Sequence, residues 1–333
     1  MVAPGHGRYR PAGGGGYGRR AGAGAVAGAA GLDALGRAGG FPPGAAEGLV
    51  QAGGLDVTLE DSNGSVTTVQ IVGGSDRFDL GHAALASMMI ARDKGLPVKA
   101  VAVFARHSDI GLLVPADSGI AGPEQLKGRK VAYTAGSLEA PFIDAFLARG
   151  KLKKSDLELI NVDAASKAST YAVGRADAAF STIPFFLPVV SQNRPSRAVR
   201  FADFGLDMPS FGLFASEDKL RERGEAIGRF ASVSARAWEY IYAGHEDEAV
   251  SAILAQRPQA RLDRTVLRGQ IDALRGYFGL AAGQRVGAPV PADWEQAVKT
   301  LSSVGLVRAD AKAADFYVPD LARPQRYDAL VKP

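Results

Sequence analysis

The sequence predicts an α/β fold with mainly parallel sheets, and three observations lead to this class. Apolar, strand-like segments alternate with helical patterns from residue 55 onward, which is the order that parallel strands with crossover helices require. The chain has 333 residues, a length typical of two domains. Hydrophobic residues make up 47% of it, enough for substantial cores, so a wholly disordered or fibrous chain is excluded.

The first series of elements ends with residues 98–104, an almost unbroken apolar run typical of a strand covered on both faces. Gly95 and Pro97 end the helix before it. Further upstream, residues 55–59 alternate between apolar and polar types, which indicates a half-buried strand. In chain order we expect strands at 55–59, 78–80 and 98–104, with helices at 66–72 and 83–93.

A second series follows the apolar segment 110–114. It contains expected strands at 130–133, 157–162, 176–180 and 198–201, with helices at 137–149, 166–173 and 184–190. Ser137 is the expected N-cap of the first of these helices. After one more apolar strand, at 211–214, the chain becomes almost wholly helical, with Ser216 as an expected N-cap and Asp293 opening a capping-box spacing.

The formal net charge of +4 comes mostly from residues 1–54, which carry a net +3, so the rest of the chain is almost neutral. A basic face for nucleic acid is therefore not expected. The same segment holds 18 of the 41 glycines and almost no residue that could pack, so it is predicted to be non-globular. Two interpretations stay open for 1–45: an export signal with Arg19-Arg20 near an uncharged stretch, or a misassigned start.

Local signatures of catalysis are missing from the sequence. There is no cysteine, which excludes disulfides, thiol nucleophiles and cysteine-based metal sites. The four histidines are scattered singly, and neither a G-x-S-x-G motif nor a Walker loop occurs.

Polar loops follow several of the expected strands instead. In open parallel sheets ligands bind at the carboxyl ends of strands, where helix N-termini present free N–H groups. Such loops, divided between two sheets, could face each other across a cleft. The loops are Asn63-Gly64-Ser65, Gly81-His82-Ala83, Thr134-Ala135-Gly136-Ser137 and Ser181-Thr182.

Six short motifs in a fixed order resemble the substrate-binding proteins of ABC importers in the nitrate/taurine/sulfonate group, which includes the thiamine-pyrimidine binders. The resemblance covers about residues 46–250. The motifs are Leu55-Asp56-Val57, Phe78-Asp79-Leu80-Gly81, Gly95-Leu96-Pro97-Val98, Asp117-Ser118-Gly119-Ile120, Leu126-Lys127-Gly128-Arg129-Lys130-Val131-Ala132 and Gly174-Arg175-Ala176-Asp177-Ala178.

This resemblance implies a two-lobe fold of the periplasmic-binding-protein type II, hinged by two crossover strands. Lobe one would hold residues 46–110 and 216–333, lobe two 118–207, and the crossovers 110–117 and 208–215. The implied protein is a monomeric receptor, periplasmic or else extracellular and membrane-associated, that delivers a small molecule to a membrane permease, without catalytic residues, metal or cofactor. The implied ligand contacts are Asn63, Gly64, Ser65, His82, Ala83, Ser137, Leu138, Ser181, Thr182 and Phe185.

Phe104 adds a further candidate contact, because its ring could face a planar ligand or could lie in an exposed turn. His82 could equally bond a neighbouring carbonyl, and Phe185 could be a core residue. Relatives often carry Trp-Glu-Pro where this chain has Thr182-Ile183-Pro184, so a strongly cationic ligand is not expected there. Residues 1–44 also show no candidate for the first strand that the family normally has.

A solute receptor for a pyrimidine-, sulfonate- or aromatic-acid-like molecule is thus the leading hypothesis. An enzyme like the fungal pyrimidine synthases is the alternative, although their chemistry goes with a cysteine-rich motif. A ligand-sensing domain of a regulator is a third, and it would need a helix-turn-helix that residues 1–54 cannot provide.

Overall fold

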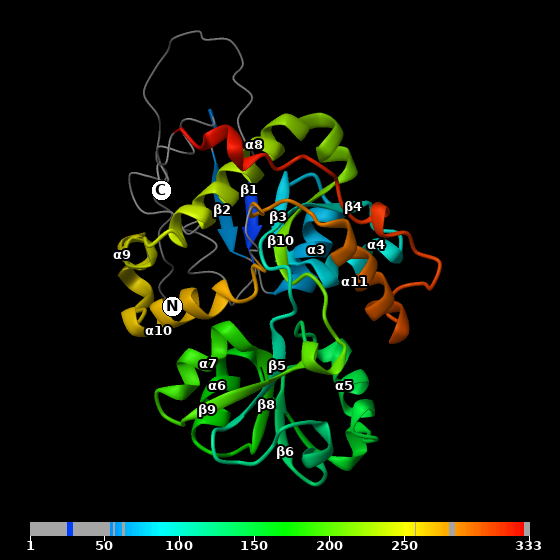
Figure 1. Ribbon diagram of the computed structural model, residues 1–333, viewed down its shortest axis with the longest axis vertical. Coiled ribbons are helices and arrows are strands. Elements are labelled where there is room, and N and C mark those ends of the chain that lie inside the picture. Colours follow the sequence, from blue (N-terminus) through cyan, green and yellow to red (C-terminus); the bar gives the residue numbers. More distant parts are fainter. Residues whose placement is uncertain are drawn as a thin grey trace, which may run out of the picture.

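The computed structural model describes residues 25–28, 54–55, 57–61, 64–256, 258–279 and 284–329 (Figure 1). Two five-stranded sheets lie one above the other in the view. The first has the order β2-β1-β3-β10-β4 and the second β7-β6-β8-β5-β9. The strands are β1 (Ala25–Gly28), β2 (Thr58–Asp61), β3 (Leu80–Ala84), β4 (Val98–Val103), β5 (Ile110–Pro115), β6 (Lys130–Tyr133), β7 (Glu158–Asn161), β8 (Ala178–Thr182), β9 (Ser196–Arg200) and β10 (Phe211–Ser216).

Helices pack on these sheets. Helices α3, α4, α8 and α11 lie around the first sheet, and α5 to α7 around the second, while α10 contacts α7 (Figure 1). Among the helices that the structure describes, none combines the length and the apolar character needed to span a bilayer. The helices are α3 (Ser65–Gly74), α4 (Leu85–Asp93), α5 (Ile143–Arg149), α6 (Ala164–Ala172), α7 (Ile183–Ser191), α8 (Glu217–Ile241), α9 (Glu246–Gln256), α10 (Arg264–Arg275) and α11 (Pro291–Ser303).

Strand direction follows from how the chain enters each sheet. Strands β1 to β4 share one direction and β10 is antiparallel to its neighbours, while in the second sheet β5 is the antiparallel strand. The chain reaches β5 from the first sheet and β10 from the second, so each of these strands starts at the edge where its neighbours end. Ile110 is thus paired with Thr182, and Phe211 with Ala84. The prediction of mainly parallel sheets is confirmed, with these two exceptions.

Three expectations about individual elements are wrong. The strand expected to end at Leu80 continues to Ala84, because β10 supplies a ladder partner for each of the residues that extend it. Ser137 does not cap a helix, since α5 begins only at Ile143. Asp293 lies inside α11, which begins at Pro291. Ser216 is confirmed as the N-cap of α8, where its side chain accepts a hydrogen bond from the Lys219 N–H.

The expectation that residues 1–44 contribute no strand is also wrong. Ala25–Gly28 forms β1, which lies between β2 and β3 and is parallel to both. Backbone pairing on both edges makes this possible for a segment whose sequence carries little strand pattern. The interpretation of the other residues of 1–45 as a leader lies outside the described residues and stays a prediction.

Candidate functional site

The two sheets meet where the chain passes between them. The Ser210 N–H donates to the Ala105 carbonyl at 2.8 Å, and the Leu85 N–H donates to the Ser210 carbonyl at 2.7 Å. From the second sheet, the Ile183 N–H donates to the Asp109 carbonyl at 2.7 Å. These bonds hold both connecting segments against the ends of β3 and β8. The carboxyl ends of strands from both sheets therefore share one region.

We call this region the inter-sheet site. It is made of buried or half-buried side chains from β3, β8, α7, the two connecting segments and the loop after β6. Its members are His82, Phe104, Asp109, Thr134, Ser137, Ser181, Phe185 and Phe211.

Stacked rings form its first-sheet side. The imidazole of His82 is stacked on Phe104 at 6.0 Å between ring centroids and on Phe211 at 5.7 Å. From α7, the ring of Phe185 meets Phe211 edge-on at 5.8 Å. Such edge and offset arrangements are the favourable ones for aromatic pairs. Flat rings from the first sheet and from α7 thus gather where the two halves meet.

The histidine in this stack is uncharged near neutral pH. Burial lowers the pKa of His82 from 6.5 to about 4, because the surrounding rings cannot solvate an imidazolium. Its Nδ1 is buried and has no hydrogen-bond partner among the described residues. His82 therefore offers one neutral nitrogen as a donor or acceptor, not a positive charge.

Hydroxyl groups line the second-sheet side. Thr134 and Ser137 follow β6, and Ser181 lies near the end of the neighbouring strand β8. The side-chain oxygens of all three are buried without a hydrogen-bond partner in the described part of the chain. Buried polar groups in folded proteins nearly always have partners, and such an exception calls for a water or a bound molecule. Three free hydroxyls here indicate polar contacts for a ligand.

A carboxyl group lies between these two sides. Asp109, in the first connecting segment, accepts a hydrogen bond of 2.5 Å from the Ser210 hydroxyl in the second. Its other oxygen, Oδ2, is buried with no partner in the described residues. Burial, with a smaller contribution from the nearby charge of Glu139, raises the pKa of Asp109 to about 7. Asp109 thus joins the two connecting segments and keeps one oxygen free.

Next to Asp109 is a buried ion pair that no pattern in the sequence indicates. Lys167 of α6 donates to Glu139 at 2.5 Å, and their side chains are 4% and 2% exposed. The Lys167 ammonium also lies 5.0 Å from the ring centre of Phe186. Glu139 directly precedes the short 3-10 turn Ala140–Phe142.

The two sides of the inter-sheet site touch in this structure. Leu138 and Phe142 from the second-sheet side face Ala84 and Ser210, around a cavity of about 10 Å³. This is room for about one water molecule and not for an organic ligand. Gln270 of α10 also donates to the Phe185 carbonyl at 2.9 Å.

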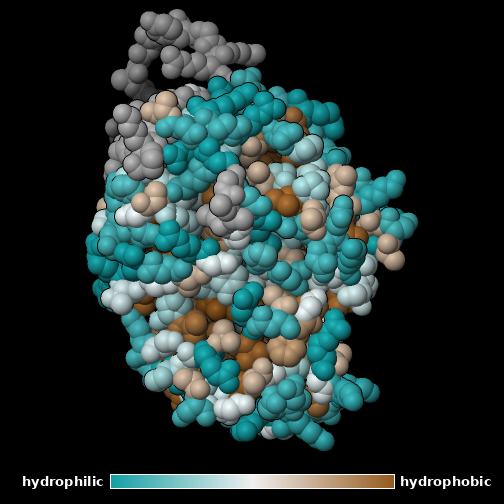
Figure 2. Space-filling view, in the orientation of Figure 1, coloured by the Kyte–Doolittle hydropathy of each residue, from teal (hydrophilic) through white to brown (hydrophobic). Residues whose placement is uncertain are grey.

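Figure 2 shows hydrophobic residues gathered on the lower half of the molecule, where α7 lies in Figure 1. Phe186, Leu187 and Val189 of α7 are only partly buried. Phe186 packs against the apolar clusters of both halves. Helix α7 therefore contributes apolar side chains to the contact between the two halves of the molecule.

The sequence and the fold are similar to those of known proteins. A family model described as NMT1/THI5 like matches residues 44–249. The chain belongs to the NMT1/THI5-like family. Among curated proteins, it is 24% identical over 276 residues to the formylaminopyrimidine-binding protein of Halalkalibacterium halodurans, covering 79% of this chain and 80% of that one.

Solved structures place the NMT1/THI5-like chain in a fold shared by receptors and enzymes. The alkanesulfonate-binding protein SsuA from Xanthomonas axonopodis pv. citri, bound to MOPS, matches with a TM-score of 0.66 and 15% identity, over 90% of this chain and 98% of that one. The desulfurization enzyme DSZB matches with a TM-score of 0.56 and 17% identity, over 90% of this chain and 97% of that one. The predicted two-lobe α/β fold class and the family resemblance are confirmed.

Of the residues predicted from the sequence, the NMT1/THI5-like structure brings His82, Phe104, Phe185, Ser137 and Ser181 into the inter-sheet site. Phe104 is 5% exposed, so the alternative of an exposed turn is wrong. The sequence analysis missed Phe211 and Asp109 as members. Phe211 was expected only as part of a strand, and no local pattern marks either residue.

The remaining predicted residues have other surroundings. The Ser65 hydroxyl accepts a hydrogen bond from the Ala84 N–H at 3.0 Å, and Gly64 precedes α3 with a φ of 94°. Ala83 is fully buried in the core of the first sheet. Leu138 lines the small cavity, and Thr182 ends β8 opposite Ile110. Asn63 lies outside the described residues.

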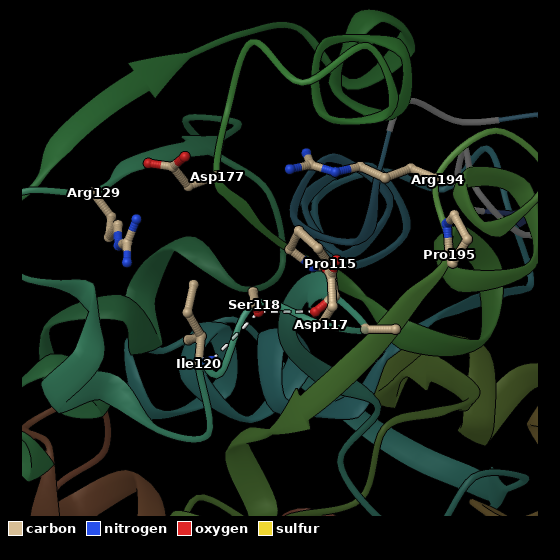
Figure 3. Close-up of a pocket in the computed structure, with 9 residues that line it drawn as sticks. Pro115, Asp117, Ser118, Ile120, Arg129, Asp177, Arg194 and Pro195 are labelled. Carbon is tan, nitrogen blue, oxygen red and sulfur yellow. Dashed lines mark hydrogen bonds between the residues drawn. The ribbon is translucent and has the colours of Figure 1, made fainter.

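A larger pocket, of about 570 Å³, lies at the opposite edge of the second sheet (Figure 3). Its polar groups hold loops together. Arg194 donates to the carbonyls of Tyr171 and Ala176, and Asp177 accepts from the Lys130 N–H. The pocket is far from the stacked rings and gathers no buried free group among the described residues, so the inter-sheet site is the better candidate.

Proposed function

We propose that this protein is an extracytoplasmic solute-binding protein that encloses a small organic molecule in the inter-sheet site and delivers it to an ABC importer. One observation carries the proposal. Buried polar atoms without partners among the described residues come from both halves of the molecule, at Thr134, Ser137, Ser181, Asp109 and His82, and His82 is also stacked on Phe104 and Phe211.

The ligand class follows from these groups. The rings of Phe104, Phe211 and Phe185 favour a planar molecule, since stacking and enclosure provide most of the affinity in such pockets. The hydroxyls favour polar atoms on its rim. A pyrimidine, an aromatic acid or an organic sulfonate has these features. The relative named as a formylaminopyrimidine-binding protein supports the first of these.

The mechanism we propose is hinge closure. Lobe one holds residues 46–110 and 216–333, lobe two holds 118–207, and the connections 110–117 and 208–215 bend. The bond between Asp109, directly before the first connection, and Ser210 in the second links the two, so they would move together. Ligand atoms would satisfy hydroxyls of lobe two while their rings stack on lobe one. The closed form of a monomeric receptor in the periplasm is then the form that the permease recognises.

Ligand-induced stabilisation tests this function. The purified protein is heated with formylaminopyrimidine, benzamide, benzoate and benzenesulfonate in separate samples. A compound present at about 100 times its Kd should stabilise the folded state by about 2.7 kcal/mol. A folded protein whose melting temperature responds to none of them contradicts the proposal. So does turnover of a bound compound, which would favour the enzyme alternative.

A pair of variants shows whether binding occurs at the inter-sheet site. Phe104→Ala removes a ring of the stack and should weaken binding of the responding compound at least about tenfold. Phe146→Ala is the matched control, because Phe146 stacks on Phe201 at 4.3 Å in the core of lobe two. It should lower the melting temperature without changing the Kd.

A further inference from the structure

The buried pair of Glu139 and Lys167 needs an explanation beyond stability. Both side chains are almost fully buried, and their atoms lie 2.5 Å apart. Removing two charges from water is costly, and replacing such a pair by apolar residues is often neutral or stabilising. A charged pair beside the inter-sheet site is therefore more easily explained by what it does to a bound molecule.

The position of the pair supports this explanation. Glu139 follows Leu138, which lines the small cavity together with Asp109. The charge of Glu139 contributes to the raised pKa of Asp109, so the two carboxyl groups are close. On the other side, Lys167 faces the ring of Phe186, which packs against both halves. The pair thus lies beside the inter-sheet site, close to Asp109 and next to Leu138.

Carboxylates neutralise the cations that the described residues place around this site. Lys167 is paired with Glu139, and Arg106 with Asp293 at 2.7 Å. His107 is paired with Asp207 at 2.9 Å. Arg200 lies 6.0 Å from the Tyr277 ring centre and 3.9 Å from Asp203.

The remaining groups do not favour a negative charge either. His82 is neutral, and Asp109 adds a carboxyl group whose hydrogen bond comes from a hydroxyl and not from a cation. An anionic ligand would enter without a counter-charge, and burying an unpaired charge is strongly unfavourable.

We propose that Glu139 determines the charge selectivity of the site: by holding Lys167, it makes the protein accept uncharged molecules and reject anions such as sulfonates and carboxylates. This inference rests on the proposed function. It goes beyond that function because it separates ligand classes that the fold accommodates equally. When the charge of Glu139 is removed, the Lys167 ammonium becomes a counter-charge for an anion in the same place.

The test compares benzamide with benzenesulfonate, two planar molecules of similar size that differ in charge. Wild type should bind benzamide at least about tenfold more tightly. Glu139→Gln preserves the size of the side chain and should bind benzenesulfonate at least about tenfold more tightly than wild type does. The double variant E139Q/K167M should lose this gain, because the ammonium is no longer there.

Asp144→Asn is the matched control. It makes the same change of charge in the same lobe, at the exposed pair of Lys154 and Asp144, whose side chains are 42% and 70% exposed. Its affinity for either probe should equal that of wild type. A similar gain for benzenesulfonate in D144N would show a general charge effect and overturn the proposal.

The remaining outcomes distinguish a failure of this proposal from a failure of the proposed function. A wild type that binds benzenesulfonate as tightly as benzamide overturns it, as does a folded E139Q variant with no gain. A wild type that binds neither probe counts against the proposed function, while a gain for benzenesulfonate in E139Q still supports the role of Glu139. If circular dichroism shows that E139Q does not fold, the affinities of the wild type decide. Binding of benzamide at least about tenfold more tightly than benzenesulfonate supports the proposal, and a smaller preference overturns it.

Discussion

On the side of the first sheet, the inter-sheet site consists of rings, with His82 stacked between Phe104 and Phe211. On the side of the second sheet, it contains hydroxyls, and the buried pair of Glu139 and Lys167 lies beside them. The first side contributes contact area without direction, whereas the second contributes directed hydrogen bonds. In the proposed function, the first half would recognise the shape of a ligand and the second half its polar groups.

The largest expected effect comes from breaking the polar side. Lys167→Met leaves the Glu139 carboxylate buried without its cation, and it should lower the free energy of unfolding by about 3–5 kcal/mol. Lys154→Met breaks an exposed pair and should lower it by less than about 1 kcal/mol. Urea unfolding followed by circular dichroism measures both. Equal losses in the two variants would mean that the buried pair is no more important than a surface pair.

Asp109, between the two sides, should make stability depend on pH. Its pKa is raised to about 7 because it is buried, against about 4 in an unfolded chain. Below about pH 4 both states hold the proton, and the stabilisation by the neutral carboxyl group is fully present. As the pH rises through about 7, the unfolded chain has already released its proton and this stabilisation is lost.

Asp109→Asn removes this dependence while its side-chain oxygen can still accept from Ser210. The variant should gain stability relative to wild type by about 1.4 kcal/mol for each pH unit between about 4 and 7. His82, whose pKa is lowered to about 4, titrates in the opposite sense, and its effect cancels in the difference between the two proteins. Thermal unfolding at several pH values measures this difference. A constant difference across the range would exclude Asp109 as the titrating group.

The same comparison shows which elements and site residues can be predicted from the sequence. The strand-and-helix alternation predicted most elements and the loop that carries Ser137, because turn residues and apolar runs are local patterns. The loop expected at Ser181-Thr182 is wrong, because both residues belong to β8. Phe104 could be nominated because it ends an apolar strand. Family motifs then supplied the two-lobe fold, which alternation alone does not specify.

What could not be predicted depends on contacts between distant segments. Lys167 and Glu139 are 28 residues apart in different elements, and no local sequence pattern around either residue predicts their pairing. Asp109 and Ser210 are 101 residues apart. The extension of β3 to Ala84 follows from pairing with β10, a strand that comes far later in the chain. Such pairs become visible only when the topology is known.

The smallest expected effect distinguishes a structural serine from a ligand-binding one. The Ser65 hydroxyl accepts from the Ala84 N–H, so Ser65→Ala leaves a buried donor unsatisfied and should lower the free energy of unfolding by about 1–3 kcal/mol. The Ser181 hydroxyl is buried with no partner in the described residues. Ser181→Ala should therefore change that free energy by no more than about 0.5 kcal/mol, or raise it.

Affinity should follow the opposite order, because Ser181 is available to a ligand and Ser65 is not. Calorimetric titration with the compound that stabilises the wild type should show weaker binding by Ser181→Ala and an unchanged Kd for Ser65→Ala. If Ser181→Ala lost as much stability as Ser65→Ala and kept its affinity, the hydroxyls of the second sheet would be structural. The polar groups of a ligand would then have to be recognised by Asp109 and Glu139 alone.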